Sequence, residues 1–299
     1  MIGYTKTPIQ EIKSQIFEQK GIRLIIKRED QNHPFASGNK WWKLKYNLEE
    51  ALRLGYKTLL TFGGAYSNHI YATAAAAKEV GLKSIGIIRG EETMPLNHTL
   101  VFAESCGMKF QYVSREEYRK KTESGFVQKL NDRFGDFYLI PEGGTNALAV
   151  KGVAEFGKQL VNEVDFDYLC LPVGTGGTMA GIVNGFEGAR KIVGFSVLKG
   201  GGFLKGEVKK YTGNGDDNWS ILKDYHFGGY GKIKDELINF MKEMETNYQL
   251  PLDHVYTAKM MFGIFDLIRK DYFKNGSTIL AIHTGGLQGK VSLSQLNSG

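Results

Sequence analysis

Short hydrophobic runs alternate along the chain with longer stretches in which apolar residues recur at helical spacing. The short runs are typical of buried strands that end at glycine or polar turns, and they span residues 57–62, 84–88, 138–140, 168–173, 192–197 and 278–282. The stretches between them predict helices over residues 41–54, 68–80, 177–186, 232–246 and 256–273. Strands that alternate with helices indicate an α/β fold with open, mostly parallel sheets flanked by helices.

The length of the chain predicts two lobes, because 299 residues exceed what one hydrophobic core usually fills. No flexible linker is visible, so we expect the chain to cross between the lobes at tight connections near Lys45 and Gly152. The larger domain would then comprise residues 1–44 together with 153–299, and the smaller domain residues 45–152. Glycine-rich segments at 199–203 and 213–217 are expected to be mobile surface loops.

The composition is that of a soluble globular enzyme, with 42% hydrophobic and 23% charged residues. No apolar run approaches the length of a membrane span, so we expect no membrane partner. The opening residues lead into a polar segment at 10–15 without a signal peptide, and we therefore expect a cytoplasmic protein.

The net charge of +6 is spread over the chain, with basic residues interspersed among carboxylates, as in residues 115–123. We therefore expect no nucleic-acid partner, and interpret the charge as favouring solubility and anionic substrates. The two cysteines, Cys106 and Cys170, lie in or beside apolar segments, which argues against a disulfide framework or a zinc site. No metal is expected.

Lys40 and the glycine turn at 173–178 together indicate a cofactor site divided along the chain. A lysine amine can bond covalently to an aldehyde, and a glycine-rich turn from strand to helix can bind a phosphate. Pyridoxal phosphate carries both groups and performs chemistry on amino acids that side chains alone cannot. Either segment alone is more often a solvated lysine or an ordinary turn, but the combination favours the cofactor site.

A second glycine turn, residues 62–69, follows a predicted strand and opens an alanine-rich helix. The first amides of a helix lack intrahelical partners and attract an anion, and ligands of open α/β sheets bind beyond the carboxyl ends of the strands. Ser67, Asn68 and His69 supply a hydroxyl, an amide and an imidazole at this place. Helix capping by Ser67 or Asn68 is the simpler alternative, but it does not explain the glycine pair.

Three further segments contain candidate residues, and each is more often structural when taken alone. Tyr230 lies among glycines at 228–231, and Tyr256 lies at the start of an amphipathic helix, where tyrosines commonly pack in the core. In the strand end at 282–286, Thr284 could direct its hydroxyl at a ring nitrogen, whereas we expect His283 to be structural.

Read in order, these motifs resemble the family of D-cysteine desulfhydrases and 1-aminocyclopropane-1-carboxylate deaminases, which are tryptophan synthase β-like pyridoxal phosphate enzymes. The resemblance covers nearly the whole chain and rests on residues 27–30, 37–44, 63–69, 140–146, 174–178, 228–231, 255–259 and 283–286. It implies pyridoxal 5'-phosphate as the cofactor, a small amino acid as the substrate, a two-lobed fold and usually a homodimer. The larger domain would bind the cofactor.

The same resemblance implies roles for individual residues around the cofactor. Lys40 would form the Schiff base, and Lys43, one helical turn later, would contact the phosphate. Thr284 would be the partner of the pyridine nitrogen, and Asn68 would hydrogen-bond the phenolic oxygen. The phosphate cradle would consist of Thr175, Gly176, Gly177 and Thr178.

On the substrate side, the resemblance places Ser67, Asn68 and His69 near the carboxylate or the departing group of the substrate. Tyr230 and Tyr256 correspond to the two active-site tyrosines of the family, and with Lys40 and Ser67 they complete the expected catalytic set.

Two positions distinguish the branches of this family. Ring-opening deaminases place glutamate directly after the second tyrosine and leucine at the strand end, where this chain has Thr257 and Thr284. A carboxylate beside the pyridine nitrogen favours its protonated form and makes a stronger electron sink, whereas a neutral hydroxyl does not. Because expelling a thiolate is easier than opening an unactivated ring, we expect α,β-elimination from D-cysteine, giving pyruvate, hydrogen sulfide and ammonia. The alternative is a deaminase of aminocyclopropane carboxylate or of another small amino acid.

Other positions depart from the family pattern. Many relatives have a basic residue at Trp42, and an arginine or glutamine in the helix that here contains Tyr71 and Ala72. These changes predict a substrate pocket that is narrower or that accepts a different amino acid. The segment 199–218 does not align with the family, so the sequence predicts no substrate contacts there.

Two other classes of protein could contain some of these motifs. A nucleotide-binding regulatory protein is disfavoured, since the chain lacks a spaced G-x-G-x-x-G motif and a Walker lysine. A non-catalytic pyridoxal phosphate carrier would keep Lys40 and the phosphate turn without needing Ser67, Tyr230 and Tyr256.

Overall fold

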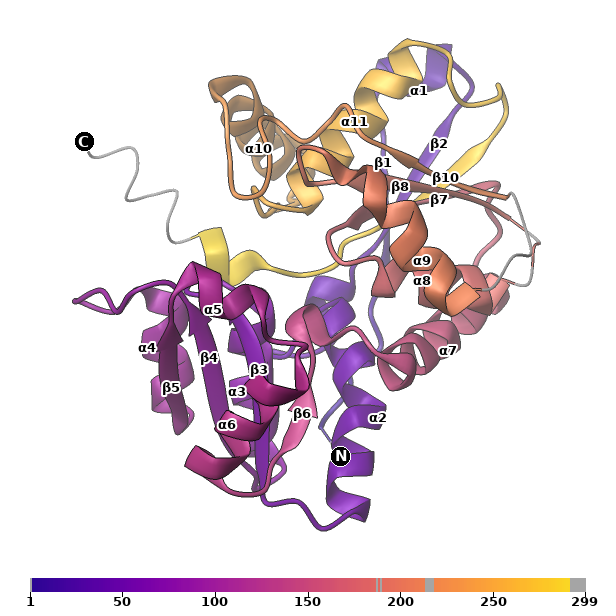
Figure 1. Cartoon of the computed structure of the whole chain (residues 1–299). Coiled ribbons are helices and arrows are strands. Elements are labelled where there is room, and N and C mark those ends of the chain that lie inside the picture. The colour runs from indigo at the N-terminus through magenta and orange to yellow at the C-terminus, as the bar shows by residue number, and fades with distance from the viewer. Residues whose placement is uncertain (1, 187, 189, 213–217, 291–299) are drawn as a thin grey trace.

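The computed structural model of the chain describes residues 2–186, 188, 190–212 and 218–290. Over these residues, ten strands form two sheets, and helices cover both faces of each sheet (Figure 1). All neighbouring strands are parallel except β1 and β2. The expected α/β class with mostly parallel sheets is therefore confirmed.

The larger sheet joins segments from both ends of the chain. Its order is β1-β2-β10-β7-β8-β9, with bounds Ile9–Ile12, Arg23–Lys27, Thr278–Ile282, Tyr168–Val173, Lys191–Ser196 and Trp219–Leu222. Successive side chains face opposite sides of a strand, so Ile25 belongs to one hydrophobic core while Leu24 and Ile26 belong to another. Burial on both faces explains why these strands appear in the sequence as nearly continuous apolar runs.

Helices close both cores of this sheet. One core is covered by α1 (Gln15–Gln19), α10 (Asp235–Tyr248) and α11 (Thr257–Arg269). The other is covered by α2 (Asn39–Arg53), α7 (Ala147–Glu163), α8 (Gly177–Phe186) and α9 (Leu204–Thr212). The second core also contains Leu59 from the neighbouring sheet and Ala72 and Ala76 from a helix that packs on that sheet, so the two sheets share buried apolar surface.

The smaller sheet has the order β5-β4-β3-β6, with bounds Met108–Val113, Lys83–Arg89, Thr58–Gly64 and Tyr138–Ile140. One face is covered by α3 (Asn68–Glu79) and α4 (His98–Ser105), and the other by α5 (Arg115–Arg119) and α6 (Ser124–Phe134). All six strands predicted from the sequence are present, with ends that differ by at most two residues.

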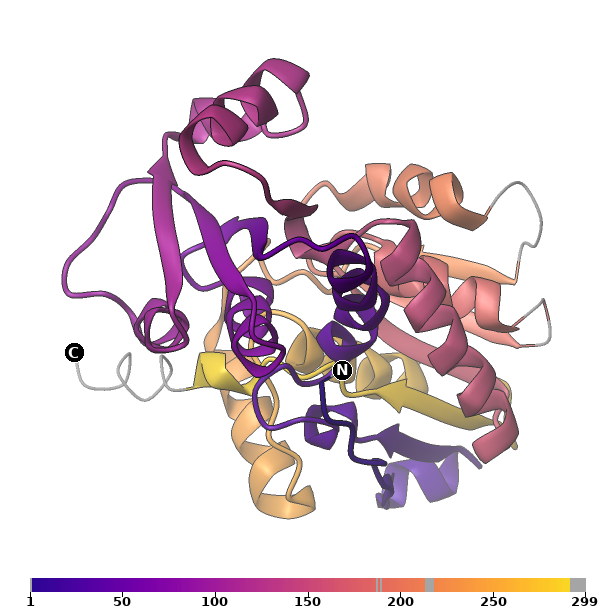
Figure 2. The ribbon, with the colours of Figure 1, turned by 90° about the horizontal axis from the view of Figure 1, so that it is seen from below.

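The two expected connections are not tight loops, because both positions lie inside helices. Lys45 lies within α2 and Gly152 within α7, and α2 lies between the smaller sheet and α7 (Figure 2). The helices cross so closely that a Cβ atom on Gly152 would lie 2.1 Å from the backbone oxygen of Trp42. Only glycine permits this approach. The domain boundaries themselves stay a prediction.

The segment after β8 also differs from the expected loop. Residues Gly201–Phe203 form a 3-10 helix (η3), and α9 follows directly, while residues 213–217 lie outside the described part. Among the helices of the described residues, none is long and apolar enough to span a membrane. The same residues contain no group of three or more His, Cys, Asp or Glu side chains arranged to hold a metal ion.

Candidate active site

The start of α2 lies against the residues that follow β10, because the Asn39 amide donates to the backbone oxygen of Thr284 at 3.3 Å. Gly38 has a φ of +70°, and a Cβ atom there would lie 2.0 Å from the backbone oxygen of Thr284. The Gly38 amide donates to the backbone oxygen of Glu29 and to Oδ1 of Asn32, each at 2.9 Å. Glycine is therefore required for the close approach that places Lys40.

The Lys40 amine is half-buried and donates to Oδ1 of Asn39 at 2.9 Å. The Asn39 amide group in turn donates to Oγ1 of Thr178 at 2.8 Å, which links the lysine to the glycine turn. Burial lowers the pKa of Lys40 to about 8, although the carboxylate of Asp253 opposes the shift. A larger fraction of this amine than of an ordinary lysine is thus neutral near neutral pH, and the neutral form is the one that attacks an aldehyde.

Lys43 is a buried lysine whose partners are neutral. Its Nζ donates to the backbone oxygen of Gly143 at 2.8 Å and to Oγ1 of Thr145 at 2.9 Å. No carboxylate of the described residues lies within ion-pair distance of it. Burial, and then the charge of Lys40, lower the pKa of Lys43 well below its ordinary value. An anion bound here would complete the donor set, because a buried ammonium needs a counter-charge.

The glycine turn between β7 and α8 provides the place for such an anion. The Thr145 hydroxyl that contacts Lys43 also lies 2.7 Å from the exposed Thr175 hydroxyl of the turn. Gly176 has a φ of +84°, and α8 begins at Gly177 with amides that have no intrahelical acceptor. The start of α8 and the Lys43 amine together form a site that fits a phosphate group.

Ser67 is the N-cap of α3, which agrees with the helix-capping alternative for the second glycine turn. Its Oγ accepts from the amides of His69 at 3.2 Å and Ile70 at 3.3 Å, which leaves its proton free to donate. Gly63 has a separate reason, because a Cβ atom there would lie 2.8 Å from Ser67 Oγ, whereas one on Gly64 would make only an ordinary contact with the Arg89 guanidinium at 3.7 Å. Capping therefore accounts for part of this turn only.

Asn68, the first residue of α3, faces the segment that follows β10. Its Oδ1 accepts from Nε2 of Gln288 in η4 (Leu287–Lys290). A Cβ atom on Gly286 would lie 2.6 Å from Asn68 Nδ2 and 3.2 Å from Cγ of Asp253. The chain after β10 thus reaches the carboxyl ends of the smaller sheet (Figure 1).

His69 lies beneath this turn as a neutral imidazole. Thr61 donates its hydroxyl proton to the backbone oxygen of Ile140 at 2.8 Å, so its oxygen accepts from Nε2 of His69, also at 2.8 Å. Nδ1 then faces the Thr73 hydroxyl at 3.5 Å. Burial and the charges of two lysines lower the pKa of His69 well below its ordinary value. Both ring nitrogens are therefore directed at threonines.

Tyr230 and Tyr256 lie together, although 26 residues separate them in sequence. Their ring centroids are 6.0 Å apart at 80°, an edge-to-face arrangement, and Tyr230 is 47% exposed. A Cβ atom on Gly174 would lie 3.3 Å from the Tyr256 hydroxyl, which places this hydroxyl beside the glycine turn. Burial and then the neighbouring Tyr230 raise the pKa of Tyr256 well above its ordinary value. The hydroxyl stays protonated and can donate.

Asp253 is a residue of this site that the sequence interpretation missed. It is 2% exposed, and its Oδ2 accepts from the amides of Val255 at 3.0 Å and Tyr256 at 2.9 Å. Its Oδ1 accepts from the Thr257 amide at 2.8 Å and the Thr257 hydroxyl at 2.7 Å. An aspartate just before an amphipathic helix is an N-cap signal that could have identified it.

The departures from the family pattern lie away from these groups. Trp42 is buried, stacks on Phe156 at 5.1 Å, and donates its indole N–H to Glu29 at 2.7 Å. Tyr71 stacks on Phe102 at 3.9 Å, and Ala72 is part of the core that the two sheets share. Trp42 thus packs against Phe156 of α7, and the narrower or redirected substrate pocket stays a prediction.

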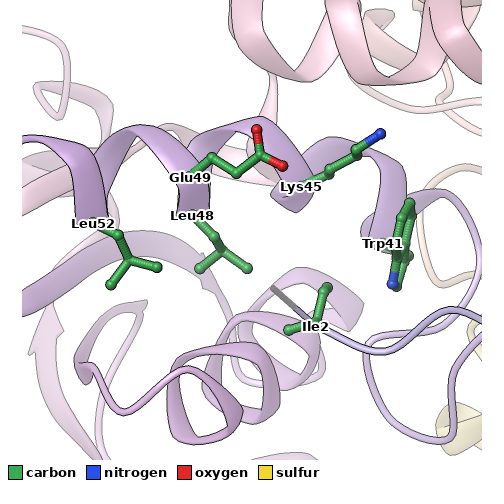
Figure 3. Close-up of a pocket in the computed structure, with 6 residues that line it drawn as sticks. All are labelled: Ile2, Trp41, Lys45, Leu48, Glu49 and Leu52. Atoms are coloured by element: carbon green, nitrogen blue, oxygen red, sulfur yellow. The ribbon is translucent and has the colours of Figure 1, made fainter.

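The other face of α2 carries a separate small pocket. It is lined by Ile2, Trp41, Lys45, Leu48, Glu49 and Leu52 (Figure 3). Lys40 and Lys43 are absent from this lining, so we do not connect it with the candidate site.

Comparison with known proteins is consistent with this geometry. Residues 1–285 match the model of the family described as pyridoxal-phosphate dependent enzyme. A Thermotoga maritima protein named "Putative 1-aminocyclopropane-1-carboxylate deaminase" is 35% identical, with 95% of this chain and 94% of that protein covered. A mitochondrial Arabidopsis thaliana protein named bifunctional D-cysteine desulfhydrase/1-aminocyclopropane-1-carboxylate deaminase is 31% identical, with 90% and 73% covered.

Among solved structures, that of an ACC deaminase homologue superposes with a TM-score of 0.82 at 30% identity, covering 98% of this chain and 94% of that one. The tryptophan synthase β-like fold implied by the resemblance is thereby confirmed. The chain belongs to the family of pyridoxal-phosphate-dependent enzymes, and its cofactor is pyridoxal 5'-phosphate.

Proposed function

We propose that the protein catalyses α,β-elimination from D-cysteine, which with water gives pyruvate, hydrogen sulfide and ammonia. The observation that carries this proposal is the neutral character of the two positions that distinguish the branches of the family. Thr284 and Thr257 offer hydroxyls only, and the nearby Asp253 carboxylate already accepts four hydrogen bonds in the cap of α11. Asp253 is therefore not free to replace the missing glutamate.

When bound, pyridoxal 5'-phosphate supplies an electron-withdrawing ring for the charge left on the substrate α-carbon. We assign its phosphate to Lys43 and the turn formed by Thr175, Gly176, Gly177 and Thr178, its ring nitrogen to Thr284, and its phenolic oxygen to Asn68. The buried Lys43 amine, which a bound anion would keep charged, and the open start of α8 support this orientation.

The protein groups then have distinct tasks in our proposal. The Lys40 amine would hold the cofactor through its aldehyde and would move a proton at the substrate α-carbon, for which its lowered pKa of about 8 suits it. Ser67 and Asn68 bind the substrate carboxylate at the start of α3. The protonated Tyr256 hydroxyl donates to the departing sulfur, and the hydroxyl of Tyr230, whose ring packs against Tyr256, assists this proton transfer. His69 supports the turn from below, since its nitrogens face Thr61 and Thr73.

Deamination of 1-aminocyclopropane-1-carboxylate is the second candidate, and the names of the relatives support it equally. The choice of the D-enantiomer rests on the resemblance alone. We expect the purified protein to release sulfide and pyruvate from D-cysteine faster than it forms 2-oxobutyrate from aminocyclopropane carboxylate. A panel with D- and L-amino acids, scored for ketoacid and sulfide, measures this. The reverse order of rates would refute the elimination, and no turnover of any member would favour a non-catalytic cofactor carrier.

A variant tests the physical reason for this preference. Thr257→Glu with Thr284→Leu is expected to shift the ratio of the two rates toward ring opening, since a carboxylate favours the protonated ring nitrogen. Thr257 is fully buried against Asp253, so Asp253→Asn is added to avoid two carboxylates in one buried place. The triple variant is compared with Asp253→Asn alone. An unchanged ratio would contradict the role of these positions.

Lys43→Ala is expected to weaken cofactor binding by about 10- to 100-fold while the covalent bond through Lys40 still forms. The reason is the loss of one charge-assisted contact to the phosphate, roughly 1.5 to 3 kcal/mol. Equilibrium titration of the cofactor into the apoprotein measures this, with Lys45→Ala on the same helix as the control. Equal affinity in the Lys43 variant and the wild type would place the phosphate elsewhere.

The homodimer, the small amino-acid substrate and the cytoplasmic location are likewise part of our proposal. Analytical ultracentrifugation of the holoenzyme tests the first of these.

A further inference from the structure

Lys259 in α11 is fully buried, and its partners are backbone oxygens. Its Nζ donates to the backbone oxygens of His226 at 2.9 Å and Gly229 at 2.7 Å. Burial lowers the pKa of Lys259 to about 8 against the opposing effect of Asp253, so the amine is mostly protonated at pH 7. A buried ammonium persists only where hydrogen bonds compensate its lost hydration. Both of the backbone oxygens that accept from Lys259 belong to one short turn.

That turn, residues 226–231, carries Tyr230. Its backbone is unusual, since Phe227, Gly228, Gly229 and Gly231 all have positive φ. The two oxygens that Lys259 contacts also close the turn, because they accept from the amides of Gly229 at 3.0 Å and Lys232 at 3.1 Å. Lys259 thus adds a charged donor to the acceptors that hold the turn in a conformation most residues avoid.

Helix α11 also determines where Tyr256 lies. Tyr256 immediately precedes the helix, and the Asp253 cap fixes its amide. Lys259, three residues later on the same helix, reaches the turn of Tyr230. We propose that Lys259 is a positioning residue that holds Tyr230 against Tyr256, so that one helix places both tyrosines. This inference rests on the proposed function only in assigning Tyr230 to the site of reaction.

Amide hydrogen exchange of the holoenzyme tests the structural part. Lys259→Met is expected to raise the exchange rates of the Gly229 and Lys232 amides about 10-fold or more, because a charge-assisted contact to their acceptors is lost. Lys27→Met is the matched control: Lys27 is also buried, and its amine donates to the Thr7 backbone oxygen at 2.9 Å and to Glu163 at 2.7 Å. Unchanged exchange at Gly229 and Lys232 would overturn the proposal. If Lys259→Met does not fold, Lys259→Gln, which keeps one donor, is used and should raise the same rates less.

A double-mutant cycle tests the catalytic part. Lys259→Met is expected to lower kcat about 10-fold or more with a smaller change in KM, and to have no further effect in a Tyr230→Phe background. Lys27→Met should leave kcat unchanged. Independent, multiplying effects of Lys259→Met and Tyr230→Phe would overturn the positioning role. If Tyr230→Phe alone left kcat unchanged, the proposed role of Tyr230 would fail, whereas the exchange measurement would still decide whether Lys259 holds the turn.

Discussion

Lys40→Ala is expected to abolish both turnover and the covalent attachment of the cofactor. The neighbouring Lys43 is directed at Gly143 and Thr145, so it does not substitute for the missing amine. Borohydride reduction followed by mass spectrometry measures the covalent adduct, and ketoacid release measures turnover. We expect neither signal in the variant, while the cofactor still binds through its phosphate.

The control for this variant is Lys45→Ala on the same helix. The Lys45 amine pairs with Glu155 at 2.7 Å and lies at the separate pocket of α2. The Lys45→Ala variant should therefore keep the covalent adduct and the turnover of the wild type. A reducible adduct at wild-type level in Lys40→Ala would show that another lysine bonds the cofactor.

Tyr256→Phe is expected to lower kcat by roughly 10² to 10⁴-fold, the usual contribution of a general acid. The ring remains in place beside Tyr230, and only the hydroxyl is removed. The free energy of unfolding should therefore change by about 1 kcal/mol or less. Kinetics and denaturant unfolding of the same samples measure the two effects.

Tyr46→Phe is the matched control, because the Tyr46 hydroxyl donates to Glu155 of α7 at 2.9 Å and is not part of the candidate site. We expect a similar small loss of stability there and no loss of kcat. If Tyr256→Phe lost activity only in proportion to its stability, the tyrosine would be a packing residue and not an acid.

Five of the six predicted strands were readable from the sequence because each is a short, doubly buried apolar run, and the sixth, β6, is a short apolar run at a sheet edge. The strands that the sequence interpretation did not identify lie mostly toward sheet edges, where one face is partly exposed and the apolar run is broken. β9 at 219–222 and β5 at 108–113 are of this kind. Helix α7 was missed because Gly152 suggested a turn, whereas its missing Cβ instead allows α2 to pack closely.

The candidate site could likewise be predicted only in part from residue types and their spacing in the sequence. Lys40, the glycine turn at 173–178 and the Ser67 turn stand out because residue type and spacing reveal a nucleophile and an anion-binding helix start. Asp253 and Lys259 do not stand out in this way. Their roles depend on partners in a helix cap and in a turn 30 residues away.

The sequence by itself thus determined the fold class, the family and the residue types available for chemistry. Only the tertiary structure decided their charge states and neighbours: the lowered pKa of Lys40, the neutral ring of His69 and the engaged carboxylate of Asp253. The physical reason is that desolvation and hydrogen bonding depend on what packs around a group. In this chain, those surroundings come from segments that only the folded sheets bring together.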